Sequence, residues 1–221
     1  MRQYKHQYVD GTKANLPVGK VVCVGRNYAD HAVELNNPVP TTPMLFMKPS
    51  TAIVPLDEPF EVPMDYGSVH FETEMAILIG QPLKNANKHE IEDAIAGIGV
   101  GLDLTLRELQ SKLKERGHPW EKAKAFDGSC PLSLFIEPAA VADIQDMQIK
   151  LTINNAVRQD GNSSFMLNKV YPLIAYMSHY FTLLPGDVVL TGTPAGVGAI
   201  NPGDNLIVEL GNQLRINTHV V

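Results

Sequence analysis

Two glutamates one residue apart and a later aspartate are the residues of this chain whose types and spacing best suit chemistry. Glu72 and Glu74 lie in the apolar-rich run 69–79. Asp103 lies in the glycine-spaced apolar run 97–105. Side chains alternate faces along a β-strand, so Glu72 and Glu74 would point the same way, with Cβ atoms about 6.5–7 Å apart. Carboxylates carried into a core are costly without a cation, so the three acids predict a divalent-metal site.

A Glu-x-Glu pair also occurs on the solvated face of an ordinary antiparallel strand, which is the alternative interpretation of Glu72 and Glu74. Asp103 favours the metal site, because a lone acid in an apolar segment needs a partner. All three candidate ligands are carboxylates, and no Cys or His stands beside them at zinc-site spacing. Hard ions are therefore favoured over a structural zinc. We predict Mg²⁺ or Mn²⁺ as cofactor, with Ca²⁺ or Zn²⁺ as substitutes in a crystal.

The composition narrows the class of protein. With 221 residues and 44% hydrophobic content, the chain suits one domain with a sizeable core. A net charge of −6 and a pI near 5.6 argue against nucleic-acid binding, and residues 112–116 are interpreted as a solvated helix end. No apolar stretch approaches the roughly 20 residues that span a bilayer, and the N-terminus lacks a signal-peptide pattern. We expect no membrane partner and a cytoplasmic location.

The order of predicted elements indicates the fold class. Strands are expected at 21–24, 148–154, 188–191 and 206–210, and helices at 27–35, 88–96, 105–116 and 169–181. Asn27 is expected to cap the first helix, which should end at 36–38. Short strands without regular βαβ alternation predict an α+β fold, a β-rich roll of mixed sheets with short helices inserted.

Two pairs of polar residues on predicted helices and one lysine are further candidates for a functional site. His31 and Glu34 are three residues apart and would share a helix face, where a carboxylate can orient an imidazole. Arg107 and Gln110 have the same spacing, and Lys124 lies in a segment of mixed polarity. On these residues alone, an ordinary solvated surface remains the alternative for each.

Five segments carry a family resemblance. They are Val-Gly-Arg-Asn-Tyr-Ala-Asp-His at 24–31, His-Phe-Glu-Thr-Glu at 70–74, Leu-Asp-Leu-Thr-Leu-Arg-Glu-Leu-Gln at 102–110, Ala-Lys-Ala-Phe-Asp at 123–127, and Pro-Gly-Asp-Val-Val-Leu-Thr-Gly-Thr-Pro at 185–194. In this order and spacing the chain resembles the fumarylacetoacetate hydrolase family. It is most similar to the short, single-domain branch that contains acylpyruvate hydrolases and oxaloacetate decarboxylases or tautomerases.

The resemblance implies a β-roll, a homodimer and a metal held by Glu72, Glu74 and Asp103. We expect residues 1–20 to be an N-terminal extension packed on a single catalytic domain, 21–221.

The resemblance also assigns roles around the metal. It implies that His31 and Glu34 form a general-base pair on a helix that closes over the ligand, and that Lys124 stabilises an enolate or oxyanion. It places Arg107 and Gln110 against the substrate, with Lys48 and Thr193 as further candidates. The longer fumarylacetoacetases have an additional Asp ligand where this chain has Val24-Gly25-Arg26. Arg26 would instead pair with a small α-keto acid.

The predicted function is hydrolysis of the carbon–carbon bond of small 2,4-diketo acids, such as acetylpyruvate or fumarylpyruvate, to pyruvate and a carboxylic acid. The alternatives use the same site. One is an oxaloacetate decarboxylase or tautomerase, and another is an isomerase of the 2-hydroxyhepta-2,4-diene-1,7-dioate type. A catalytically silent metal-dependent binding protein is less consistent with His31, Glu34 and Lys124, because binding alone needs no base.

Overall fold

Strand β5 (Thr73–Ile79) lies at the centre of a seven-stranded mixed sheet. The computed structural model describes residues 4–35 and 38–221. The sheet runs in the order β2 (Met44–Lys48), β1 (Val21–Gly25), β11 (Val188–Leu190), β5, β6 (Ile95–Leu102), β8 (Cys130–Leu132) and β3 (Ile53–Pro55). The β1–β11 and β3–β8 pairs are parallel, and the other pairs are antiparallel.

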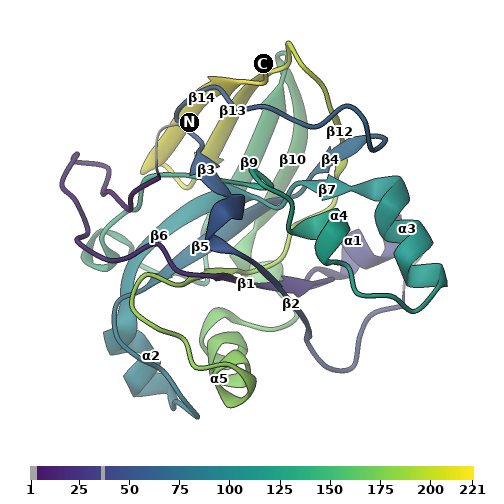
Figure 1. The fold of residues 1–221 in the computed structure, drawn as a ribbon. Coiled ribbons are helices and arrows are strands. Elements are labelled where there is room, and N and C mark those ends of the chain that lie inside the picture. The colour runs from purple at the N-terminus through teal and green to yellow at the C-terminus, as the bar shows by residue number, and fades with distance from the viewer. Residues whose placement is uncertain (1–3, 36–37) are drawn as a thin grey trace.

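Two smaller sheets complete the β structure (Figure 1). A four-stranded antiparallel sheet has the order β10 (Ala156–Asn162), β9 (Gln148–Ile153), β13 (Asn205–Leu210) and β14 (Leu214–His219). A three-stranded sheet has the order β12 (Gly198–Ile200), β4 (Val69–Phe71) and β7 (Thr105–Leu106). In β9 and β13 every second side chain is buried, which is the alternation of a sheet with one face on the core.

The helices are short and lie around these sheets. They are α1 (Ala29–Glu34), α2 (Lys88–Ala94), α3 (Arg107–Glu115), α4 (Glu121–Lys124) and α5 (Val170–Tyr180), with 3-10 turns at Ser50–Ala52, Pro138–Ala140 and Ser163–Phe165. Figure 1 shows α2 and α5 together at one side of the large sheet, and α1, α3 and α4 together at another. The predicted α+β fold of mixed sheets with short helices is therefore confirmed. Among the described residues, no helix is both long and apolar enough to cross a membrane.

Strand β6 packs so closely against residues 133–135 that two of its positions require glycine. A Cβ atom on Gly97 would lie 2.8 Å from the Cβ atom of Phe135, and one on Gly99 would lie 2.7 Å from Ser133 Oγ. The glycine spacing in this run therefore serves close packing. It leaves Asp103, directly after β6, as the polar group at the end of a buried strand.

The structure corrects three local predictions. The run 69–79 is not one strand, because the chain passes from the three-stranded sheet to the seven-stranded sheet at Glu72. Residues 105–106 form β7, so α3 begins only at Arg107. Helix α1 is not capped by Asn27. Its N-cap is Tyr28, without a side-chain hydrogen bond.

Asn27 has a long-range role instead. Its amide nitrogen donates to the carbonyl oxygens of Asn168 and Thr191, at 3.0 and 2.8 Å, and its amide oxygen accepts from the Asn168 backbone N–H at 2.7 Å. Within the predicted end of this helix at 36–38, residues 36 and 37 lie outside the described residues.

The turn at Gly186 holds the N-terminal residues against the domain. Gly186 has φ = 89°, and a Cβ atom there would lie 1.9 Å from the carbonyl oxygen of Pro17. The Gly186 carbonyl oxygen lies 3.1 Å from Nε2 of the buried His6. We expect Gly186→Ala to lower the free energy of unfolding because it adds both backbone strain and a clash.

A second Pro-Gly-Asp turn supplies the control for this substitution. Gly203 has the same φ of 89°, but nothing lies within 4 Å of a Cβ atom placed there. Gly203→Ala should cost about 1–2 kcal/mol through backbone strain alone, and Gly186→Ala about 1–3 kcal/mol more. Urea denaturation of both variants measures the difference. Equal losses would show that the contact with Pro17 does not constrain the turn.

Candidate metal centre and active site

Three buried carboxylates meet where β4 ends, β5 begins and β6 ends. Glu72 lies between β4 and β5, Glu74 lies in β5, and Asp103 follows β6. One carboxylate oxygen from each lies within 4.8 Å of the others. The residues are 5%, 1% and 1% exposed, respectively. The Asp103 backbone N–H donates to the Glu72 carbonyl oxygen at 2.8 Å, which fixes the two chain segments side by side.

Three cationic side chains contact this carboxylate group. Lys124 Nζ donates to Glu72 Oε2 at 2.8 Å and to Asp103 Oδ2 at 2.5 Å. Arg107 Nη2 donates to Glu72 Oε1 at 2.5 Å. From the other side, Lys48 Nζ forms an ion pair with Asp103 Oδ1 at 2.8 Å. The three formal negative charges thus face three positive ones in a buried space.

The two glutamates experience opposite electrostatic environments. Burial and the neighbouring charges of Asp103 and Glu72 raise the pKa of Glu74 well above its usual value. Burial also acts to raise the pKa of Glu72, but the nearby charges of Lys124 and Arg107 outweigh it and lower that pKa. The charge of Lys124 and the Gly192 backbone N–H act to lower the pKa of Glu74, but they do not outweigh its burial and the two neighbouring acids.

The donor set fits a hard divalent cation. All three groups offer carboxylate oxygen, which is the ligand type that Mg²⁺ and Mn²⁺ prefer. A cation bound to Glu72, Glu74 and Asp103 would stabilise the carboxylate form of Glu74. Three protein ligands also leave coordination positions for a bidentate ligand and water.

Gly192, in the loop after β11, holds the Glu74 carboxylate in place. Its backbone N–H donates to Glu74 Oε2 at 2.7 Å. The residue has φ = 91°, and a Cβ atom would lie 2.6 Å from the Cβ atom of Asn27. Only glycine brings this N–H to the carboxylate without displacing Asn27.

Gln159 connects the same loop to the start of β5. Its side-chain oxygen accepts from the Thr73 backbone N–H at 3.0 Å, and its amide nitrogen donates to Thr193 Oγ1 at 2.7 Å and to the Pro194 carbonyl oxygen at 2.9 Å. Thr193 is 2% exposed. The predicted substrate contact of Thr193 stays a prediction, and in the structure its hydroxyl accepts this hydrogen bond.

The two residues of the predicted general-base pair, His31 and Glu34, lie on α1. His31 is 4% exposed, and its Nδ1 atom lies 3.5 Å from Glu34 Oε2. Both oxygens of Glu34 also accept from the Gly196 backbone N–H, at 3.0 and 3.2 Å. The loop after β11 therefore holds Glu34 as well as Glu74.

A cavity of about 50 Å³ reaches the carboxylate group at Glu72. Six of the predicted residues line it: Arg26, His31, Glu72, Arg107, Gln110 and Lys124. Within α3, Arg107 Nη1 donates to Gln110 Oε1 at 2.8 Å, so these two side chains face the cavity as a pair.

Lys48 does not line this cavity. It is fully buried, and its ammonium also donates to the carbonyl oxygens of Ser129, Leu104 and Lys124. These bonds tie β2 to the segments that carry Asp103 and Lys124. The predicted substrate contact of Lys48 stays a prediction.

Sequence reasoning missed several residues that line the small cavity, among them Phe46, Lys114 and Trp120. Lys124 Nζ lies 5.1 Å from the centre of the Phe46 ring, and the Phe46 and Trp120 rings are 6.3 Å apart. Lys112, Lys114, Glu115 and Arg116 are exposed, as predicted for a solvated helix end, but Lys114 also borders the cavity. The spacing of Lys114, four residues after Gln110, was the available signal for its position.

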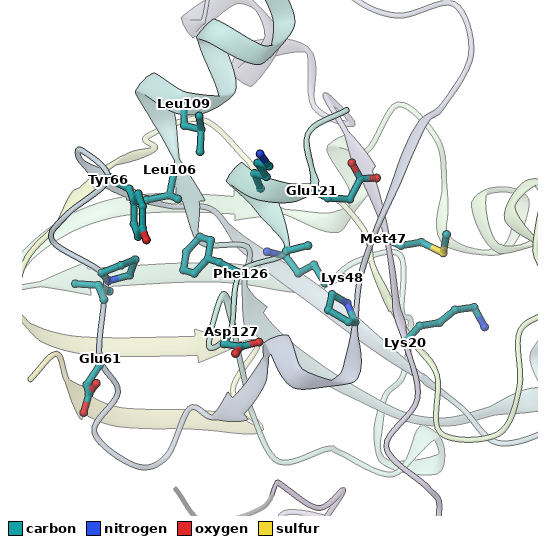
Figure 2. A pocket seen from close by; sticks show the side chains of 15 residues that line it. Lys20, Met47, Lys48, Glu61, Tyr66, Leu106, Leu109, Glu121, Phe126 and Asp127 are labelled. Carbon is teal, nitrogen blue, oxygen red and sulfur yellow. The ribbon is translucent and has the colours of Figure 1, made fainter. Parts of the chain in front are cut away.

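A larger cavity of about 1030 Å³ lies nearby and is lined mostly by apolar side chains (Figure 2). Lys48, Leu106, Leu109 and Phe126 are among its lining residues, whereas the three carboxylates are not. Its rim is charged, with Lys20 and Glu61 on different segments. The chemistry described above therefore belongs to the smaller cavity.

Comparisons with known proteins agree with this geometry. The chain is 54% identical over 207 residues to oxaloacetate tautomerase YcgM of Escherichia coli (strain K12), which covers 93% of this chain and 94% of that protein. A crystal structure of a fumarylacetoacetate hydrolase family protein from Yersinia pestis CO92 is 51% identical, with a TM-score of 0.97, and the match covers 99% of this chain and 100% of that one.

A third relative was solved with ligands. The structure of fumarylpyruvate hydrolase from Pseudomonas aeruginosa in complex with Mn²⁺ and pyruvate is 33% identical, with a TM-score of 0.92, and the match covers 100% of this chain and 97% of that one. The model of the fumarylacetoacetate hydrolase C-terminal family matches residues 20–221. The site geometry, the fold and these matches together show that the chain belongs to the fumarylacetoacetate hydrolase family.

Proposed function

We propose that this protein is a divalent-metal-dependent tautomerase that interconverts the keto and enol forms of oxaloacetate. The observation that carries the proposal is the buried group of Glu72, Glu74 and Asp103 beside a small cavity that Lys124, Arg107 and His31 line. The sequence led us to expect acylpyruvate hydrolysis first. We place tautomerisation first because the relative with 54% identity bears that name.

Tautomerisation needs a group that stabilises negative charge on the C2 oxygen of the substrate. A Mg²⁺ or Mn²⁺ ion held by the three carboxylates would act as a Lewis acid toward a 2-oxo acid. Lys124 lies against two of those carboxylates, so its ammonium can donate to the oxygen on which charge develops. Arg107, beside Glu72 and paired with Gln110, is placed to bind a substrate carboxylate.

His31 is assigned the proton transfer at C3. Its Nδ1 atom faces Glu34, which leaves Nε2 for the substrate. When Nε2 takes a proton from C3, the electron pair of the C–H bond forms the C2–C3 double bond, and protonation of the C2 oxygen gives the enol. The reverse sequence returns the keto form. Glu34 stabilises the imidazolium that forms between these two steps.

Hydrolysis of an acylpyruvate is the second candidate. It is favoured by the contact between His31 and Glu34, which would equally orient an imidazole to activate water. The 33% identical fumarylpyruvate hydrolase supports it too. The two reactions differ in whether water attacks a distal carbonyl.

The deciding experiment supplies freshly dissolved enol-oxaloacetate or acetylpyruvate to the protein with Mg²⁺, with Mn²⁺ and with a chelator. Loss of enol absorbance and release of pyruvate are followed in parallel. We expect metal-dependent enol loss from oxaloacetate without matching pyruvate release. Pyruvate and acetate from acetylpyruvate would instead establish the hydrolase, and pyruvate from oxaloacetate alone would indicate a decarboxylase.

A further inference from the structure

We propose that Lys114 and Arg26 form a subsite for the second carboxylate of a dicarboxylic 2-oxo acid. The subsite would make the protein select substrates with an anionic group at each end over monocarboxylic 2-oxo acids of the same length. This inference rests on the proposed function, in that a 2-oxo acid occupies the small cavity with its 2-oxo carboxylate group toward Glu72.

One face of α3 runs along the cavity, from an inner end near Glu72 to an outer end. Arg107, Gln110 and Lys114 are spaced i, i+3 and i+7, so they lie in a row along one side of the helix. All three line the cavity. At a rise of 1.5 Å per residue, Lys114 stands about 10 Å beyond Arg107 along the axis. Arg107 contacts Glu72, so Lys114 marks the outer end.

Arg26 approaches the same cavity from the end of β1. It lines the cavity together with Lys114. Its backbone has φ = 57°, a conformation that is costly for a residue other than glycine, and such conformations cluster at ligand sites. Its guanidinium donates to the Pro38 carbonyl oxygen at 3.4 Å.

The cationic side chains have different neighbours at the inner and outer ends of the cavity. At the inner end, Lys124 and Arg107 each contact carboxylates of the metal centre. At the outer end, positive charges lie near one another. Burial, followed by the charges of Arg26 and Arg107, lowers the pKa of Lys114. An anion bound there would relieve this repulsion.

Aromatic side chains line the cavity as well. Phe46 and Trp120 give the space between the two ends an apolar wall. Low polarity there strengthens the attraction between the outer cations and a distal carboxylate.

Two probes that do not depend on the reaction test the subsite. Difluorooxaloacetate carries both carboxylates but has no C3 hydrogen, and 2-oxobutyrate has a methyl group in place of the distal carboxylate. Their dissociation constants are measured calorimetrically on Mn²⁺-loaded protein. We expect Lys114→Met to weaken binding of difluorooxaloacetate about tenfold and binding of 2-oxobutyrate less than twofold. Arg26→Asn, which tolerates the left-handed backbone, should do the same.

Lys112→Met is the matched control, because Lys112 lies on the same helix, is exposed and does not line the cavity. It should change neither constant. The subsite is wrong if wild-type protein binds both probes equally, if it binds neither, or if Lys114→Met weakens both by the same factor. Discrimination between the probes without tautomerase activity would uphold the subsite and overturn the proposed reaction.

Discussion

Glu72→Gln is expected to remove metal binding and turnover together. The substitution keeps the shape of the side chain but replaces an anionic ligand with a neutral amide, and it takes away the partner of Lys124 and Arg107. A metal Lewis acid supplies several kcal/mol to a reaction of this kind, so kcat/KM should fall by about 10³-fold or more. Calorimetric titration with Mn²⁺ and the enol-loss assay measure the two effects.

The control for this substitution is Glu115→Gln, at the exposed end of α3. It should leave both metal affinity and turnover unchanged. Circular dichroism and urea denaturation of Glu72→Gln establish that the variant is folded when it is tested. A folded Glu72→Gln protein that retains turnover in the presence of a chelator would defeat the assignment of the metal centre.

Lys48→Met is expected to cause the largest loss of stability. Lys48 is fully buried, and its removal leaves Asp103 with one fewer cation and takes a donor from the carbonyl oxygens of Leu104 and Ser129. Breaking a buried ion pair on one side costs about 3–5 kcal/mol because the remaining charge is uncompensated. Urea denaturation of metal-free protein measures this loss.

A double variant separates charge from packing. Lys48→Met combined with Asp103→Leu removes both charges, so it should recover part of the lost stability while remaining unable to bind Mn²⁺. Lys122→Met, at an exposed position of α4, should be neutral. A loss below about 1 kcal/mol in Lys48→Met would show that Lys48 does not support the metal centre.

Local sequence patterns were sufficient for the elements and for the carboxylates. Periodicity placed α2, α3 and α5 to within two residues, since their apolar positions recur at helical spacing. Ile174 and Met177 of α5 are fully buried. The pairing of Glu72 with Glu74 followed from strand alternation, although the chain changes sheets at Glu72.

The contacts that support the site could not be read from the sequence. Gly192 reaches Glu74, and Gln159 reaches Thr73, across long separations in the chain. Propensity favoured Asn27 as a helix cap, but its tertiary hydrogen bonds to Asn168 and Thr191 determine its position. Such partners depend on which strands become neighbours, and local periodicity carries no information about that.

The most direct test of the central claim is the exchange of C3 hydrogens of oxaloacetate for deuterium, followed by ¹H NMR in D₂O with Mg²⁺-loaded protein. A tautomerase must break the C3–H bond in each turnover, whatever the position of the keto–enol equilibrium. We predict exchange that is faster than in protein-free and chelator-treated controls and that precedes any release of pyruvate. Exchange no faster than in those controls would contradict the proposed function.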